Sequence, residues 1–283
     1  MICILSPAKT MIASHNIGET CAALVTRSLP IFSEKASVLG NVLKKKTKGE
    51  LKTLCGVSDA LSAHVKGIYS SLLVDEEDDA LTVGTSHYNQ AALMFDGPAF
   101  RGLAAKDVSA AEGEGLQKHL RILTGLYGYV KPGDLIQEHR LCMGTKLVVS
   151  KDHKDLYQFW GETLAEGIVR DVQEQLHALQ SGDNGSDDKT QQKSKLYKKK
   201  KEKTTHDAGV VGNSPLIPLI VNCASQEYSK SILPHLLSVA SVTAAAGGGG
   251  GGTSIRVVEC VFLDGGIIKS AFAKRARGNL IQP

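Results

Sequence analysis

The sequence predicts an α/β fold, with α+β as the alternative, in a single compact domain built around a mixed sheet. Two observations favour this class. Short segments rich in β-branched residues alternate along the chain with stretches whose apolar residues have helical spacing. The composition is that of an ordinary globular protein, with 42% hydrophobic and 22% charged residues in a chain of 283. We expect one domain over residues 1–283.

The strand pattern occurs in four short segments, which are Met1–Leu5, Lys146–Val149, Leu219–Asn222 and Ile255–Phe262. The first segment opens MICILSPAKT, in which no basic residues precede the apolar run and no cleavage site follows it. We therefore expect a first strand there and not a secretion signal. Since no apolar run approaches the roughly 20 residues of a membrane span, we expect a cytoplasmic protein with no membrane partner.

Helical spacing predicts helices over Thr20–Thr26, Phe32–Leu43, Leu116–Leu123, Asp155–Leu179 and Tyr228–Leu237. The fourth of these begins at an aspartate, a residue that caps helix N-termini well. Its apolar residues recur at near-helical intervals, so we expect this helix to contribute to the core.

Two stretches differ in composition from the rest. Residues 181–213 are polar, lysine-rich and aperiodic, which predicts a disordered insertion. Residues 244–253 read AAAGGGGGGT and predict a flexible linker. Inside the first stretch, Lys198–Lys201 is interpreted as a solvated run, with a nuclear localisation signal or a nonspecific nucleic-acid arm as alternatives.

Residues 51–69, LKTLCGVSDALSAHVKGIY, predict two short helices joined by a glycine turn, as in a helix-hairpin-helix unit. Gly56 is free to adopt positive φ, and Ser58 suits an N-cap. Amides at such a turn, together with the dipole of the second helix, form a seat for a phosphate. The alternative is a corner of two helices that packs on the core. If the segment is such a seat, the residues that contact the nucleic-acid backbone are Lys52, Cys55, Gly56, Val57, Ser58, His64 and Lys66.

Polar and basic residues follow several predicted strands. Lys9 lies just after the first strand, and NCASQEYSK over residues 222–230 follows another. The carboxyl ends of strands in α/β sheets are where sites are built. The glycine-rich segment 120–147 brings Arg121, Lys131, Arg140 and Lys146, and residues 271–279 bring Lys274, Arg275 and Arg277. Each cluster is either an anion-binding surface or an ordinary solvated basic surface.

No metal site or cofactor is expected from the residue spacing. The six cysteines form no CxxC pair and none lies at metal-ligand spacing from a histidine, so we interpret them as reduced and mostly buried. The motifs HExxH, GxSxG and the Walker phosphate loop are absent from the sequence. Catalytic residues and a reaction type therefore do not follow from spacing. The net charge of +4 permits an anionic partner without requiring one.

Several longer motifs carry a resemblance. ILSPAKT, HLRILTGLYGYVKPGDLI, EHRLCMGTKL, KDLYQFWG, VNCASQEYSK and AKRARG occur in the order found in the peroxide stress protein YaaA family, which the chain resembles from residue 2 to about residue 278. Family members usually carry glutamate where this chain has Cys142.

The resemblance implies a cytosolic protein that limits hydrogen peroxide damage, is linked to lower free iron, and binds double-stranded DNA through a helix-hairpin-helix motif beside a basic cleft. The cleft residues that it implies here are Lys9, Arg121, Arg140, Lys230, Lys274 and Arg277. We therefore expect DNA backbone binding without strong sequence preference, and an enzyme is the less favoured class. The alternative function is an enzyme that acts on a small phosphorylated or nucleotide ligand at a strand edge.

Overall fold

The computed structural model describes residues 1–17, 27–74, 87–180, 217–246, 255–262 and 270–281. Within these residues a five-stranded mixed sheet runs in the order β6-β5-β1-β8-β9. The strands β5, β1, β8 and β9 are parallel, and β6 pairs antiparallel with β5. Their bounds are β1 (Ile2–Leu5), β5 (Leu120–Thr124), β6 (Gly128–Val130), β8 (Leu219–Cys223) and β9 (Arg256–Glu259). The predicted α/β class with a mixed sheet is confirmed.

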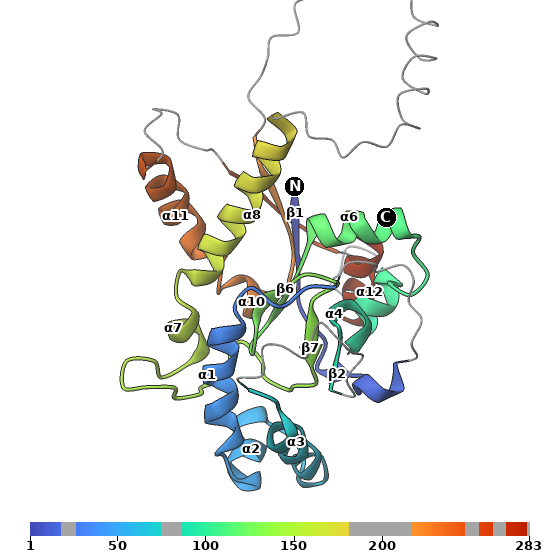
Figure 1. The fold of residues 1–283 in the computed structure, drawn as a ribbon, viewed down its shortest axis with the longest axis vertical. Helices are drawn as coiled ribbons and strands as arrows, with labels where there is room; N and C mark the ends of the chain where they lie inside the picture. Colours follow the sequence, from blue (N-terminus) through green and yellow to red (C-terminus); the bar gives the residue numbers. More distant parts are fainter. Residues whose placement is uncertain (18–26, 75–86, 181–216, 247–254, 263–269, 282–283) are drawn as a thin grey trace, which may run out of the picture.

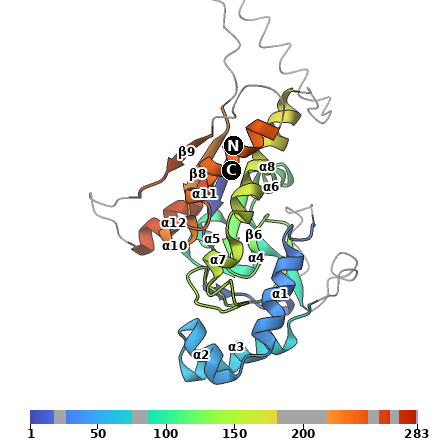
Figure 2. The ribbon, with the colours of Figure 1, turned by 90° about the vertical axis from the view of Figure 1, so that its left-hand side faces the viewer.

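Two short antiparallel ladders accompany the main sheet. One pairs β2 (Thr10–Met11) with β4 (Phe95–Asp96), and the other pairs β3 (Tyr88–Gln90) with β7 (Leu135–Gln137). β9 forms one edge of the main sheet (Figure 2).

Helices lie on both sides of the sheet. α8 and α11 pack together on one side, and α12 packs on α5 on the other (Figure 1). The helices are α1 (Ser33–Lys44), α2 (Lys48–Cys55), α3 (Asp59–Ser71), α4 (Ala91–Met94), α5 (Pro98–Leu103), α6 (Ala110–His119), α7 (Leu156–Trp160), α8 (Thr163–Gln180), α10 (Gln226–Ser229), α11 (Leu233–Ala246) and α12 (Ser270–Ile281), with a 3-10 turn η1 (Ser14–Asn16). In the described part of the chain, no helix has the length and apolarity needed to cross a membrane.

One hydrophobic core joins the sheet to the helices. Tyr69, Tyr129 and Trp160 are its largest fully buried side chains, and Phe32 packs its ring against the last two. The chain starts at the upper end of β1 in Figure 1, so the carboxyl ends of the parallel strands point toward the lower end, where α2 and α3 lie. The fold therefore places the two helices of residues 51–69 at the end of the sheet where sites usually form.

Several predicted elements differ from the observed ones. The expected helix Leu116–Leu123 is wrong, since α6 ends at His119 and residues 120–124 form β5. β5 is a continuous run of buried residues between two neighbouring strands, and such a run has no alternation to distinguish it from a buried helix. Lys146–Val149 forms no strand and runs as a loop.

The predicted helix Asp155–Leu179 is two helices. Asp155 does cap the first, accepting a hydrogen bond from the amide of Gln158 at 2.8 Å. Gly161, at φ 48° and ψ −129°, ends that helix because this backbone conformation is incompatible with a continuous one. In the same way, Tyr228–Leu237 divides into α10 and α11.

The remaining element predictions are confirmed or lie outside the described residues. Strands over 2–5, 219–223 and 256–259 and the helix over 33–44 appear close to their predicted bounds. The expected helix Thr20–Thr26 and the expected insertion 181–213 fall outside the described residues. Of the expected linker 244–253, residues 244–246 are the last turn of α11, and the rest lies outside.

Candidate nucleic-acid interface

The candidate interface is the tip formed by α2, α3 and the end of α1, residues 44–66, which we call the α2–α3 tip. α2 starts with a reciprocal cap in which Thr47 accepts from the Glu50 amide and Glu50 accepts from the Thr47 amide. α2 ends at Gly56 in the left-handed conformation, φ 57° and ψ 45°, as the glycine turn predicted. Ser58 caps α3 by accepting from the Leu61 amide at 3.3 Å. Both helix ends are therefore defined locally.

The amides of the turn itself are already used. The Gly56 amide donates to the Thr53 carbonyl at 3.3 Å, and the Val57 amide donates to the Lys52 carbonyl at 3.1 Å. These bonds close the end of α2, so the expectation of outward-pointing turn amides at Gly56 and Val57 is wrong. The free donors of a helix are its first amides, which here belong to Asp59 and Ala60. The amide donors left for a candidate anion site at this tip are thus those at the N-terminus of α3.

Exposed lysines surround this N-terminus. The tip carries six lysines and two acidic residues. Lys48 and Lys52 approach the carboxylate of Asp59 at 3.4 and 3.3 Å, and all three side chains are largely exposed. The lysines hold the pKa of Asp59 below its usual value through hydrogen bonds, that of Lys52 first. The Asp59 carboxylate is therefore held between two exposed lysines at the N-terminus of α3.

Two other tip lysines support the fold. The ammonium of Lys66, which was expected to contact DNA, donates to the carbonyls of Lys44 and Lys46 at 3.0 and 2.9 Å. Lys44 donates in turn to the Leu72 carbonyl at 2.9 Å. A cation at the last carbonyls of α1 also interacts favourably with the helix dipole. Lys66 thus joins α3 to the end of α1.

Two predicted contact residues pack against the rest of the protein, and a third, the exposed His64, pairs with a residue of another segment. The half-buried Cys55 thiol donates to the Arg140 carbonyl at 3.2 Å, and burial raises its pKa to about 11. Val57 packs against the core, and His64 lies 3.1 Å from the Glu138 carboxylate. Among the residues expected at the interface, Lys52 and Ser58 are therefore the ones placed at the α3 N-terminus, beside Gly56.

Arg121 does not belong to the predicted basic cleft. Its side chain is 3% exposed, and its Nε donates to the Asp171 carboxylate at 2.5 Å. Its Nη1 donates to the carbonyls of Gln117, Lys118 and Leu120 at the end of α6. Because β5 is buried along its whole length, a cation within it needs internal partners. The expectation that Arg121 contacts an external anion is wrong.

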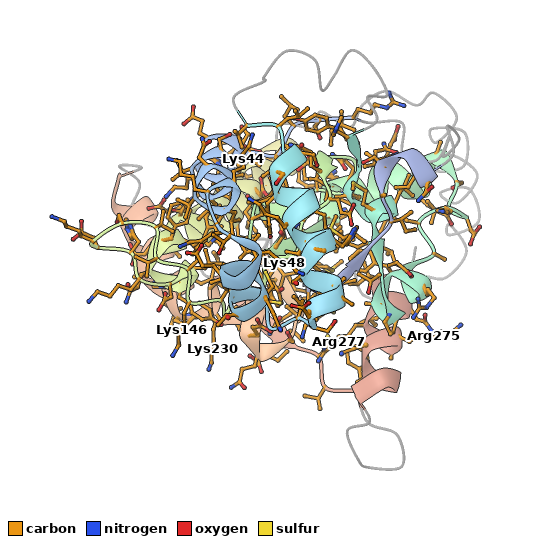
Figure 3. The ribbon with its side chains drawn as sticks, turned by 90° about the horizontal axis from the view of Figure 1, so that it is seen from below. Lys44, Lys48, Lys146, Lys230, Arg275 and Arg277 are labelled. Atoms are coloured by element: carbon orange, nitrogen blue, oxygen red, sulfur yellow. The ribbon has the colours of Figure 1, made fainter. Side chains whose placement is uncertain are left out.

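The other predicted cleft residues lie nearer the tip. Figure 3 looks onto the tip and places Lys230 with Lys146 on one side of α2 and α3, and Arg277 with Arg275 on the other. Arg140 donates from Nη1 to the Lys9 carbonyl at 3.0 Å, so these two residues lie together. Lys274 is exposed on α12. The four cations that Figure 3 labels beside the helices, Lys146, Lys230, Arg275 and Arg277, lie at the same end of the molecule as the tip.

Four tip lysines went unnoticed in the sequence. The run KKKTK at 44–48 extends from the last residue of α1 to the first residue of α2, and Figure 3 shows Lys44 and Lys48 on the face with the tip. Lys46 pairs with Glu50 at 3.0 Å, and Lys45 is exposed. The signal was a charge run beside a predicted glycine turn, which is where a phosphate-binding loop gathers its cations.

The predicted polar cluster after β8 is mainly structural. The Ser6 hydroxyl accepts from the Ser225 amide at 2.7 Å, which ties the end of β1 to the start of α10. The Glu227 carboxylate accepts from the Gly144 amide at 3.1 Å, and its carbonyl accepts from the Tyr157 hydroxyl at 2.7 Å. These groups hold the 141–149 loop on α10. The Glu227 groups that a strand-edge enzyme could use are therefore already engaged in bonds that shape the fold.

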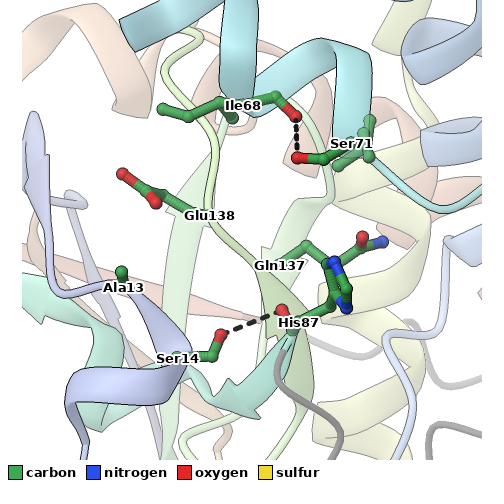
Figure 4. A pocket seen from close by; sticks show the side chains of 8 residues that line it. Ala13, Ser14, Ile68, Ser71, His87, Gln137 and Glu138 are labelled. Atoms are coloured by element: carbon green, nitrogen blue, oxygen red, sulfur yellow. Dashed lines mark hydrogen bonds between the residues drawn. The ribbon is translucent and has the colours of Figure 1, made fainter.

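A small cavity of about 250 Å³ lies beside the end of α3 (Figure 4). Several of its polar groups bond locally: Ser14 donates to the His87 carbonyl at 2.9 Å, and Ser71 donates to the Ile68 carbonyl at 3.2 Å. Glu138, also on its wall, pairs with His64. Within the described ranges, no group of three or more histidine, cysteine, aspartate or glutamate side chains gathers to hold a metal ion.

Comparison with known proteins gives a consistent result. A family model described as peroxide stress protein YaaA matches residues 1–185. A UPF0246 protein of Ralstonia nicotianae is 33% identical over 98% of this chain and 83% of its own length. A UPF0246 protein of Burkholderia ambifaria has the same identity and coverage, and one of Bordetella avium is 32% identical over 100% of this chain and 84% of its own.

Proposed function

The chain belongs to the peroxide stress protein YaaA family, and we propose that it acts in that response by binding the phosphate backbone of double-stranded DNA through the α2–α3 tip. The observation that carries the proposal is the position of Asp59. Its carboxylate lies at the N-terminus of α3 within reach of Lys48 and Lys52, where a DNA phosphate would make the same contacts.

The neighbouring cations extend this contact surface. Lys146 and Lys230 on one side and Arg275 and Arg277 on the other share the face of the tip (Figure 3). Such contacts neutralise phosphates and read no bases, so binding is independent of sequence. Each phosphate contact releases a counterion, which makes the affinity fall steeply with salt.

The test is binding of a labelled duplex across a salt series. The Lys48→Gln/Lys52→Gln variant removes two cations at the seat, and we expect the slope of log affinity against log salt to decrease by about 2. The Asp59→Asn variant removes the competing carboxylate and frees both lysines, so we expect tighter binding. Lys118→Gln on α6 removes an exposed lysine at the opposite end of the sheet and serves as the control.

The Lys118→Gln control distinguishes this seat from general electrostatic attraction. A nonspecific effect of charge would make Lys118→Gln weaken binding about as much as either tip lysine. If the tip and control variants have the same slope, or if wild-type protein fails to bind at low salt, the α2–α3 tip is a structural corner and the proposal is wrong.

We extend the proposal to the link with iron. Phosphate oxygens are hard ligands that hold iron near DNA, and a protein bound to them excludes the metal from the backbone. We expect wild-type protein to reduce nicking of a supercoiled plasmid by ferrous iron and peroxide. Lys48→Gln/Lys52→Gln is expected to protect less at equal concentration. Equal protection by both proteins would separate the peroxide role from DNA binding.

A strand-edge enzyme is the alternative. The half-buried Arg277 favours it, because its Nε is buried and has no hydrogen-bond partner within the described residues. A nucleotide that binds there would raise the melting temperature, and the shift would grow with the nucleotide concentration. A panel of nucleotides tests this, and Arg277→Gln should remove any shift that is seen.

A further inference from the structure

Two cysteines face each other at the carboxyl end of the sheet. β8 ends at Cys223 and runs parallel to β9, with Asn222 opposite Glu259. The Cys260 amide donates to the Asn222 carbonyl at 3.1 Å, which continues the ladder by one position. Cys223 and Cys260 are therefore the next pair in this register.

The spacing of this pair suits a disulfide. Neighbouring strands lie about 4.8 Å apart, and the Cα atoms of bonded cysteines are usually about 4.4–6.8 Å apart. The side chains of Cys223 and Cys260 point to the same face of the sheet and form a hydrogen bond with each other. Both are free thiols in this structure.

The other described cysteines do not fit as partners. Cys3 lies opposite Val221, two positions away from Cys223, and diagonal neighbours at that offset are about 7–8 Å apart, beyond the reach of a disulfide. The Cys55 thiol bonds to the Arg140 carbonyl, and the Cys142 thiol interacts with Tyr228. Among the described cysteines, Cys260 is thus the partner that the strand register gives to Cys223.

The two thiols differ in their surroundings. Cys223 is fully buried, and burial raises its pKa, while the Arg277 guanidinium on α12 acts in the opposite direction. Cys260 is partly exposed just beyond the edge strand β9, where a small oxidant reaches it. Arg277, whose buried Nε has no hydrogen-bond partner among the residues that the structure describes, places a cation near Cys223. Such a cation stabilises the negatively charged sulfur that forms during thiol exchange.

We propose that Cys260 and Cys223 form a reversible oxidation site for hydrogen peroxide. The Cys260 sulfur attacks one peroxide oxygen, the O–O bond breaks, and Cys260 becomes a sulfenic acid as one water leaves. The Cys223 sulfur then attacks the Cys260 sulfur, forming the S–S bond and releasing a second water. Two thiols are oxidised and one peroxide is reduced to two waters. The disulfide joins β9 to β8, and this inference does not depend on DNA binding.

The experiment treats the reduced full-length protein with one equivalent of hydrogen peroxide and maps its peptides without reduction. We expect peptides that contain Cys223 and Cys260 to be joined, with the loss of two thiols and two hydrogens per chain, and to separate on adding dithiothreitol. Cys223→Ala is expected to leave a sulfenic acid on Cys260 that dimedone traps. The matched control, Cys55→Ser/Cys142→Ser, is expected to form the same link at the wild-type rate.

Three results would overturn the proposal. One is a wild-type map in which Cys223 and Cys260 stay unlinked while other cysteines are oxidised. Another is the absence of a dimedone adduct on Cys260 in Cys223→Ala. The third is loss of the link in the control variant, which would assign the reaction to Cys55 or Cys142. Circular dichroism of each variant verifies that it is folded before the reaction is scored.

Discussion

Basic and acidic residues pair both around β5 and at the α2–α3 tip. The pair around β5 is buried, whereas those at the tip are exposed to solvent. Around β5, Arg121 and Asp171 are 3% and 5% exposed and bond to each other, and Asp171 also accepts from the Tyr129 hydroxyl at 3.0 Å. At the tip, Lys48 and Lys52 lie in solvent and share one aspartate.

The two sets of charges differ in whether the partner of each ion can be replaced by another group. A buried ion has lost its water, so it depends on its protein partner and contributes to stability only while that partner is present. An exposed ion pair gains little from its partner, and a DNA phosphate can replace that partner at small cost. The interior charges are therefore expected to govern folding, and the tip charges are expected to govern binding.

The largest effect is expected from Arg121→Met. This change leaves the Asp171 carboxylate buried without its cation and the end of α6 without its donor, so we expect the free energy of unfolding to fall by about 3–5 kcal/mol. Chemical denaturation measures it. The double variant with Asp171→Leu should recover a large part of the loss, because neither ion then remains. Equal losses in the single and double variants would contradict the buried-pair account.

The next effect is a dependence of stability on pH. Burial lowers the pKa of His139 to about 4, and the neutral ring donates from Nδ1 to the Gln137 carbonyl while Nε2 accepts from the Thr124 hydroxyl. In the unfolded chain its pKa is about 6.5. The unfolded state therefore binds more protons between pH 6.5 and 4, so His139 alone makes stability fall by about 3 kcal/mol as the pH falls through that window.

Asp134 opposes this change. Burial raises its pKa to about 6, against about 3.9 when unfolded, so the folded state binds the extra proton and stability rises as the pH falls from 6 to 4. We expect the two contributions to cancel in the wild type over that range. Asp134→Asn should reveal the loss of stability in acid, and His139→Gln should reveal the gain. Denaturation at pH 4.5–7 measures the stability of both variants. If stability changed with pH in the same way in both, the roles assigned to Asp134 and His139 would be wrong.

A smaller effect separates the backbone of the tip from its charges. Gly56→Ala places a side chain in the left-handed region, where a Cβ meets no neighbour, so the cost is conformational and about 1 kcal/mol. The matched control is Gly67→Ala, in the middle of α3 with open space around it, which is expected to stabilise by about 0.5–1 kcal/mol. Thermal unfolding measures both. If both substitutions changed the stability in the same direction, Gly56 would not be in the left-handed conformation described.

The smallest effect on stability is expected from Lys48→Gln/Lys52→Gln. Both side chains are exposed, and their ion pairs with Asp59 are the kind that contribute little to folding. We expect the denaturation midpoint to stay at the wild-type value while DNA binding weakens. A large drop in the midpoint would mean that the tip resembles the interior, and the comparison between the two regions would fail.

The sequence predicted the tip better than it predicted the cleft. The left-handed turn at Gly56 and the N-cap at Ser58 depend on residues that are neighbours in the sequence. Both were predicted correctly. Arg121 and Lys66 were misassigned because their partners lie far along the chain: Asp171 is 50 residues from Arg121, and Lys44 is 22 from Lys66. A single sequence carries no signal for such partners.

By itself, the sequence determined the α/β class, the first and last parallel strands, the capped helix after Asp155 and the two helices of the tip, because each depends on a local pattern of side chains or a local backbone preference. The tertiary structure alone decided that β5 is a buried strand, that Arg121 faces inward, and that Cys223 lies opposite Cys260. These depend on which strands become neighbours, and burial and pairing between distant segments are properties of the folded chain as a whole.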